Sequence, residues 1–416
     1  MDVVVIGGGP AGLAAAIEAK KHNVKEVMII ERDIELGGIL QQCIHDGFGL
    51  HRFGKRLSGC EYAENFIEGV ESEEDIIVKL KTIVIEITKD KTIYAMNEEE
   101  GMMEIHSKAI ILAMGCRERT RSQVFIWGTR PSGVLTAGTV QRYINMEGYL
   151  PGKKAVILGS GDIGLIMARR MTLEGIKVEG VYEVMDSPGG LTRNISQCLK
   201  DYNIPMHLST TVVKIHGNKK LEGVTIAQVD KDKKPIKGTE KYIECDLLVL
   251  AVGLIPENEL SRQMEINIDP RTKGPIVDEN FMTSIEGVFA AGNVVTVFDL
   301  VDYVSETGEI AARGAAKYLK GDLDLSSDYQ DIIPGDNVNF IVPQKIRKQN
   351  LEDKLPIYFR VKQPLKKVTV VGEIEGQKCL KKKHVVVLPP EMIVEEIDCE
   401  KIKDKNEMLK ISVKVG

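Results

Sequence analysis

The sequence predicts an α/β protein over most of its length and an all-β unit at its C-terminal end. A strand, a glycine-rich turn, a helix and a second strand occur in this order twice, at residues 2–31 and 153–183. Short β-rich runs broken by proline, glycine and charge fill residues 332–416. A chain of 416 residues exceeds one ordinary core, so we expect two or three domains.

Composition excludes several classes of protein. Hydrophobic residues make up 43% and charged residues 28% of the chain, with a formal net charge of −6, which is typical of a soluble protein and not of a nucleic-acid-binding surface. No apolar run reaches the roughly 18 residues of a membrane span. The seven cysteines are scattered and form no C-x-x-C pair, so we expect no disulfide framework, no metal site and a reducing, cytoplasmic location.

The first glycine-rich turn predicts a dinucleotide-binding site. Gly7 permits a tight turn, Gly9 lets the backbone approach a pyrophosphate, and Gly12 lets the helix pack closely on the strand. The helix N-terminus offers free N–H groups to the phosphates. Glu31 follows Gly12 by 19 residues and is placed to bind ribose hydroxyls. The predicted contacts of this site are Gly7, Gly9, Pro10, Ala11, Gly12, Glu31 and Arg32.

A second turn of the same kind predicts a second site. The interval from Gly164 to Glu183 is again 19 residues. No Arg or Lys follows Glu183 until Arg193, so the sequence favours NAD(H) over NADP(H), whose 2′-phosphate needs a cation. Two Rossmann-like three-layer domains are therefore predicted. The predicted contacts of the second site are Gly159, Gly161, Ile163, Gly164 and Glu183.

Four further motifs occur in a recognisable order. They are "AIILAMGCRER" (109–119), "LLVLAVGLIPENEL" (247–260), "GVFAAGNVV" (287–295) and "LVDYVSETGEIAARGAAKYL" (300–319). Together with the two turns, they resemble the flavoproteins with two dinucleotide-binding domains, the pyridine nucleotide-disulfide oxidoreductase superfamily. The resemblance covers residues 1 to about 320. It implies FAD in the first site and a pyridine nucleotide in the second.

The resemblance also implies further cofactor contacts. Those with FAD are Gly38, Val84, Ala113, Gly115, Gly292 and Asn293, and one with NAD is Gly253. Asn293 stands where the family has an aspartate beside the ribityl chain, so this contact loses its charge. The helix that begins near residue 301 would face the flavin ring with its positive end.

The segment "CRERTRSQVFIWGTRPSGVLTAGTVQRYIN" (116–145) adds a narrower resemblance. It resembles the FAD- and NAD-binding subunits of opine, proline and sarcosine dehydrogenases and of cyanide synthase. It looks most like a small oxidoreductase that accompanies glycerol-3-phosphate dehydrogenase-like proteins. The implied partner is such a dehydrogenase subunit, and the resemblance also allows an oligomer.

The predicted domain limits follow from these motifs. The FAD domain is discontinuous, at 1–118 and 275–325, the NAD domain occupies 128–252, and the β-rich domain occupies 332–416. The alternating run at 75–96 predicts strands of a small antiparallel sheet. Lysines 381–383 are expected in a solvated turn, and docking of a partner by the C-terminal domain is the alternative.

Cys43 and His45 lie in "GGILQQCIHDGFG" (37–49), just after a glycine pair. The disulfide reductases of the family carry C-x4-C here, and this chain lacks the second cysteine. Cys43 is thus either a single redox thiol, activated by His45, or a packed neighbour of the flavin.

Three functions remain open at this stage. The first is an NADH-dependent FAD oxidoreductase that passes electrons to a partner dehydrogenase or another acceptor. The second is a stand-alone disulfide or peroxide reductase that uses Cys43. The third is a non-catalytic flavoprotein subunit.

Overall fold

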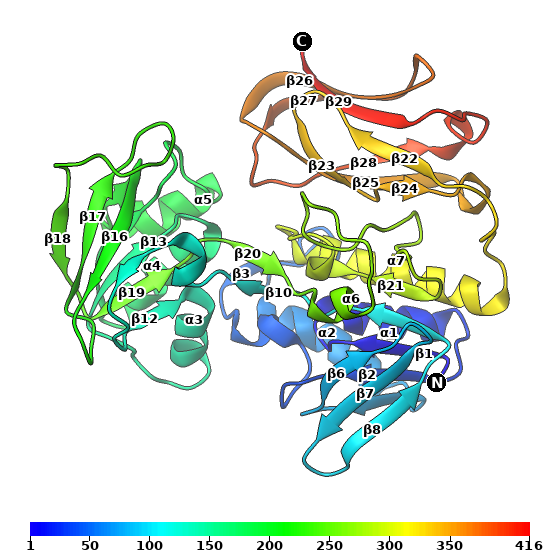
Figure 1. Ribbon diagram of the computed structural model, residues 1–416, viewed down its shortest axis with the longest axis horizontal. Helices are drawn as coiled ribbons and strands as arrows, with labels where there is room; N and C mark the ends of the chain where they lie inside the picture. Colours follow the sequence, from blue (N-terminus) through cyan, green and yellow to red (C-terminus); the bar gives the residue numbers. More distant parts are fainter. The chain divides into compact units, whose positions relative to one another are not determined.

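The computed structural model describes residues 1–416 and divides into two compact units. The first unit comprises residues 1–41, 46–116 and 256–416, and the second comprises residues 42–45 and 117–255 (Figure 1). Segments 116–118 and 254–256 pair as the two-stranded sheet β10–β20. None of the helices is long and apolar enough to cross a lipid bilayer.

A five-stranded parallel sheet forms the centre of the first unit, in the order β21-β9-β1-β2-β5. Strands β1, β2, β9 and β21 are apolar and buried throughout, as expected for a parallel sheet covered on both faces. The bounds are β1 Val3–Ile6, β2 Val27–Ile30, β5 Ile76–Lys79, β9 Ala109–Leu112 and β21 Val288–Ala290.

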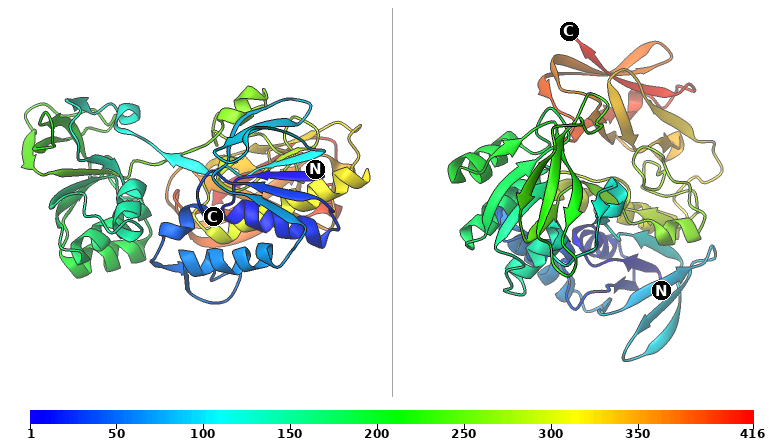
Figure 2. Two further views of the ribbon diagram at one scale, coloured as in Figure 1. Left: turned by 90° about the horizontal axis from the view of Figure 1, so that it is seen from below. Right: turned by 60° about the vertical axis from the view of Figure 1, so that its left-hand side comes forward.

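Helices cover one face of this sheet and a small antiparallel sheet covers the other (Figure 2). The helices are α1 Pro10–Lys21, α2 Gly59–Glu71 and α7 Val301–Lys320, whereas the short helix α6 Glu259–Gln263 packs against β6 on the other side. The antiparallel sheet contains β6 Ile83–Ile87, β7 Thr92–Asn97 and β8 Gly101–His106, and a short hairpin contains β3 Asp46–Phe48 and β4 Leu57–Ser58. The prediction for 75–96 was wrong in one respect, because β5 pairs in parallel with β2 and so belongs to the central sheet.

The second unit repeats this plan. Its parallel sheet has the order β12-β19-β13-β14-β15, and a four-stranded sheet has the order β11-β16-β17-β18. The parallel strands are β12 Val134–Thr136, β13 Lys154–Leu158, β14 Lys177–Tyr182, β15 Met206–His207 and β19 Leu247–Leu250. The others are β11 Trp127–Gly128, β16 Thr210–His216, β17 Gly223–Gln228 and β18 Lys241–Glu244, with helices α3 Ala137–Asn145, α4 Asp162–Leu173 and α5 Thr192–Asn194. The predicted pair of Rossmann-like folds is therefore confirmed.

Residues beyond 329 form two β-sheets, which confirms the all-β prediction for this end of the chain. The sheets have the orders β24-β22-β29-β26-β27 and β23-β25-β28. The bounds are β22 Gln330–Pro334, β23 Val338–Val342, β24 Lys345–Ile346, β25 Lys354–Val361, β26 Leu365–Ile374, β27 Gln377–Val387, β28 Ile393–Asp398 and β29 Leu409–Val415. Lysines 381–383 are exposed but lie inside β27, so the predicted turn was wrong.

Most buried residues of the C-terminal sheets form an apolar cluster of their own, but a few join the main core of the first unit. Tyr358 of β25 is fully buried and belongs to the same apolar cluster as β1 and α7. Its ring packs edge-on against Phe298 and Tyr303, at centroid distances of 5.4 and 6.0 Å. Since Phe298 precedes α7 and Tyr303 lies in its first turn, the C-terminal domain supports that end of the helix.

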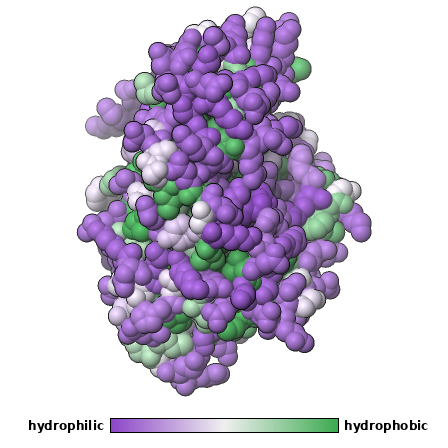
Figure 3. Space-filling model, turned by 90° about the vertical axis from the view of Figure 1, so that its right-hand side faces the viewer, coloured by the Kyte–Doolittle hydropathy of each residue, from purple (hydrophilic) through white to green (hydrophobic).

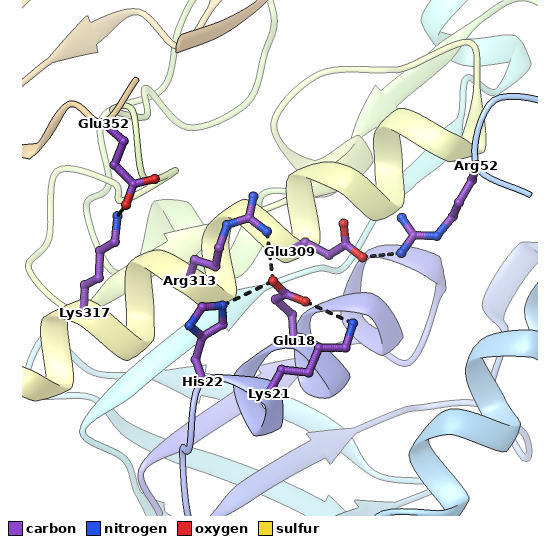
Figure 4. Close-up of polar contacts among 8 residues, drawn as sticks. All are labelled: Glu18, Lys21, His22, Arg52, Glu309, Arg313, Lys317 and Glu352. Carbon is purple, nitrogen blue, oxygen red and sulfur yellow. Dashed lines mark hydrogen bonds and ion pairs between the residues drawn. The ribbon is translucent and has the colours of Figure 1, made fainter. Parts of the chain in front are cut away.

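One side of α7 carries three charged residues at successive turns, and each pairs with a different segment (Figure 4). Arg313 lies 2.9 Å from Glu18 of α1, a carboxylate that also binds Lys21 and His22. The three pairs are Glu309 with Arg52, Arg313 with Glu18, and Lys317 with Glu352. The helix is thus fixed to α1, to the loop after β3 and to the C-terminal domain. The face of the molecule drawn in Figure 3 is mainly hydrophilic, with scattered apolar areas.

Two adjacent buried acids join the C-terminal domain to the loop before β21. Glu279 accepts a hydrogen bond of 2.8 Å from the Arg347 backbone N–H. Asp278 accepts bonds from the backbone N–H groups of Asn280 and Met282 through one oxygen. Burial, with the nearby charge of Glu279, raises the pKa of Asp278 to about 7.

This buried acid makes stability depend on pH. Because the folded-state pKa of Asp278 lies above its unfolded value of 3.8, the folded state holds the proton more tightly. The contribution of Asp278 to the free energy of unfolding is then greatest below the unfolded pKa and is lost as pH rises through the folded pKa. Asp278→Asn keeps the accepting oxygen but removes the titrating group. We therefore expect the free energy of unfolding, measured by urea titration, to decrease less between pH 4 and about 7 in this variant than in the wild-type protein. An equally steep decrease in both proteins would contradict the assignment.

Candidate dinucleotide-binding sites

The first glycine turn allows a very close approach between β1, α1 and the end of β9. Gly7 has φ +108°, and a Cβ atom there would lie 2.5 Å from the Ala113 carbonyl oxygen. A Cβ atom on Gly12 would lie 1.9 Å from the Gly7 carbonyl oxygen. Both positions therefore exclude any side chain, and the N-terminus of α1 is held directly above the turn.

Open space lies beside this helix N-terminus. Gly9 is the N-cap of α1 with an ordinary extended backbone, φ −80°, and a Cβ atom there would meet nothing within 4 Å. Pro10 occupies the first helical position, and no side chain caps the helix. Gly38, at φ +56°, lies against Gly9. An unfilled space bordered by unprotected helical N–H groups fits a pyrophosphate.

Glu31 is held rigidly at the end of β2. Its side chain is buried, one oxygen accepts a 2.6 Å bond from the Gly8 N–H, and the other accepts a 2.8 Å bond from the Asp33 N–H. Each carboxylate oxygen has a second lone pair that could accept a ribose hydroxyl. Arg32 instead forms an ion pair with Glu257 at 2.9 Å.

The remaining residues predicted for FAD lie in the same unit. Ala113 and Gly115 follow β9, and the Ala113 N–H donates to the Ile6 carbonyl. Gly292 packs between Ala11 and Val304, and Asn293 accepts a 2.9 Å bond from the Phe298 N–H. The Asn293 oxygen thus orders the loop before α7, a role the sequence did not indicate. Val84 lies on β6 and is partly buried against the core.

The second glycine turn has the same geometry. Gly159 has φ +100°, and a Cβ atom there would lie 2.1 Å from the Ala251 carbonyl oxygen. A Cβ atom on Gly164 would lie 2.6 Å from the Gly159 oxygen, whereas one on Gly161 would meet nothing within 4 Å. Ile163 packs partly buried in α4, and Gly253 follows β19 at φ +100°.

Ser160 connects the acid of the second site to the loop that follows β14. Glu183 is buried and accepts bonds from the Ser160 N–H at 2.8 Å and the Ser160 hydroxyl at 2.6 Å. The Ser160 hydroxyl oxygen in turn accepts a bond from the Gly189 N–H, and Asp162 accepts one from the Leu191 N–H. Sequence reasoning missed this arrangement, since it depends on a loop 29 residues away.

The segment around Cys43 belongs to the second unit. Gln42 is buried, donates to Gln141 of α3 at 2.9 Å, and accepts from Asn145 at 2.8 Å through its carbonyl oxygen. The Cys43 sulfur is buried and lies 3.9 Å from the Gln141 side-chain oxygen, while His45 is partly buried. In the first unit, burial raises the pKa of the Cys60 thiol, which disfavours its reactive form.

Comparison with known proteins gives the family of the chain. The family model for the pyridine nucleotide-disulphide oxidoreductases matches residues 1–311. Hydrogen cyanide synthase subunit HcnB of Pseudomonas protegens is 30% identical over 64% of this chain. An opine oxidase subunit of Agrobacterium tumefaciens is 23% identical over 78% of this chain and 66% of its own length. The chain spans 59% of the length of the HcnB relative.

The fold also has solved counterparts. The thioredoxin reductase of T. acidophilum superimposes with a TM-score of 0.61 at 24% identity. The match covers 77% of this chain and 99% of that enzyme. The likeness at this identity concerns the fold alone.

Two matched substitutions test which glycine turn holds which cofactor. Gly9→Ala and Gly161→Ala each add one methyl group into open space at an ordinary backbone conformation. We expect both proteins to fold normally. Gly9→Ala should weaken FAD binding at least tenfold, which corresponds to about 1.4 kcal/mol of binding free energy, and should lower the FAD content of the purified protein accordingly. Gly161→Ala should retain FAD and weaken NADH binding by a similar factor.

Flavin absorbance and an NADH titration followed by calorimetry provide the measurements. Thermal unfolding of the two apoproteins is the control for folding. Full FAD content in Gly9→Ala, or unchanged NADH affinity in Gly161→Ala, would contradict the assignment of the two sites.

Proposed function

Since the chain belongs to the pyridine nucleotide-disulphide oxidoreductase family, we propose that it oxidises NADH and passes the electrons through FAD to a partner protein. The family makes the chain an oxidoreductase that uses FAD and a pyridine nucleotide. The choice of NADH, the residues of each site and the partner are parts of the proposal. The observation that carries it is the presence of two open glycine turns, each beside a buried and oriented acid.

When bound, the nicotinamide ring supplies a hydride and the flavin ring accepts it. The protein contributes binding and electrostatics. The backbone at Gly9 would hold the FAD pyrophosphate, and Glu31 the adenosine ribose. The first turn of α7, supported by Tyr358, would direct its positive end to the flavin and favour the reduced, negatively charged ring.

The charges near the second site support NADH over NADPH. Glu183 is buried and fully oriented, and Asp186 follows it on the loop that Ser160 holds. A 2′-phosphate in this place would meet two acids.

We expect kcat/KM for NADH to exceed kcat/KM for NADPH at least tenfold. Glu183→Gln removes one of the two charges and should make this NADH/NADPH ratio smaller. Equal values for both nucleotides in the wild-type protein would contradict this preference.

The names of the relatives support a partner protein. HcnB and the opine oxidase relative are both subunits by name, and the chain matches only part of HcnB. We propose that this chain is likewise one subunit, and that the partner is a dehydrogenase subunit, for which a glycerol-3-phosphate dehydrogenase-like protein is the candidate. The C-terminal domain, with its exposed β27, is a candidate docking element.

A stand-alone reductase that uses Cys43 is the alternative. The buried position of Cys43 beside the amide of Gln141 argues against attack on a disulfide or peroxide in solution. A third possibility is a flavoprotein subunit whose NAD site has no catalytic role.

Anaerobic mixing of the FAD-loaded protein with NADH distinguishes these functions. We expect the flavin absorbance to bleach within seconds in both the wild-type protein and Cys43→Ser, with rates that agree within about twofold. Disulfide or peroxide turnover that disappears in Cys43→Ser would favour the alternative. Absence of bleaching in the wild-type protein would contradict the proposed function.

A further inference from the structure

The solvent face of the sheet β6–β7–β8 carries an unusual apolar row. Ile83, Met96 and Met102 lie directly opposite one another on the three strands and are 50%, 44% and 63% exposed. The outer face of an antiparallel sheet is normally polar. Methionine side chains adapt their shape readily to a partner surface. We call these three residues the methionine row.

Acidic residues border the methionine row. Glu98 and Glu99 occupy the turn between β7 and β8, and Glu104 lies on β8. All three are exposed. Glu98 and Glu99 form no ion pair within the chain, so their charge is available to a partner.

The second unit carries a surface of complementary character. Phe125 and Trp127 are 75% and 73% exposed, while Ile126 between them is buried and anchors the segment in the core. Phe125 adopts φ +55°, which is uncommon for an aromatic residue, at the end of a 3-10 turn that Thr120 and Gln123 cap. The two rings are thus presented on an ordered segment, residues 120–130, which we call the tryptophan loop.

Basic residues border the tryptophan loop. Lys214 lies directly opposite Trp127 on the neighbouring strand β16, and Arg130 follows on the loop. Lys219 and Lys220 lie beside Ser132. These four side chains are exposed, and none forms an ion pair within the chain.

We propose that the methionine row of one copy of this chain docks onto the tryptophan loop of a second copy. In this contact the thioethers of the methionine row would pack against the aromatic rings of the tryptophan loop. The acidic residues around the row would face the basic residues around the loop. Rigid exposed aromatic residues with a charged rim are typical of the energetic centre of an interface. Both complementary surfaces occur on the same chain, so the second copy is the partner that the observations favour. This association goes beyond the proposed function.

Sedimentation of the FAD-loaded protein tests the proposal directly. We expect a concentration-dependent increase in mass between about 1 and 100 µM at low salt, weakened at least tenfold at about 0.5 M NaCl because salt screens exposed charges. Trp127 is the only tryptophan, so its emission should shift to the blue and lose accessibility to iodide as the protein associates. A monomer at all concentrations would overturn the proposal.

Charge reversal on each surface identifies the residues involved. Arg130→Glu with Lys214→Glu, and separately Glu98→Lys with Glu99→Lys, should each weaken self-association at least tenfold. An equimolar mixture of the two variants should restore it, because the reversed surfaces then attract each other. Lys381→Glu with Lys382→Glu, on exposed β27, is the matched control and should associate like the wild-type protein. Association that neither reversal weakens, or no recovery in the mixture, would overturn the proposal.

Discussion

The structure depends on how closely a helix can approach a glycine turn. A single added carbon at Gly12 would come within 1.9 Å of the Gly7 carbonyl oxygen, and one at Gly164 within 2.6 Å of the Gly159 oxygen. Only glycine lets the first turn of each helix rest on the strand that precedes it. That approach directs the free N–H groups of the helix into the space beside Gly9 and Gly161.

The same constraint recurs where α7 meets α1. A Cβ atom on Gly308 would lie 2.2 Å from the Ala11 carbonyl oxygen, so the two helices pack backbone to backbone. The ion pairs of Glu309, Arg313 and Lys317 then fix α7 along its length, and Tyr358 supports its start. The helix that would face the flavin is therefore held by three parts of the first unit, and its dipole keeps one direction.

Much of this fold could be predicted from the sequence, because local patterns encode it. Glycine spacing, the acids 19 residues later and the continuous apolar strands are all short-range signals. Three other features could not be predicted, because each depends on a partner that is distant in the sequence. They are the parallel pairing of β5, the grouping of residues 42–45 with the second unit, and the hydrogen bonds of Ser160. The burial of Asp278 could not be predicted for the same reason, because distant residues such as Tyr329 and Lys345 contribute to its surroundings.

In the proposed function, the two turns hold two different dinucleotides whose rings exchange a hydride. Single-turnover flavin reduction by NADH carrying deuterium at the transferred C4 position tests it most directly. A direct transfer predicts that bleaching is several times slower with the deuterated nucleotide and that the deuterium leaves the nicotinamide. Equal rates with retention of the deuterium in the oxidised NAD would contradict the account.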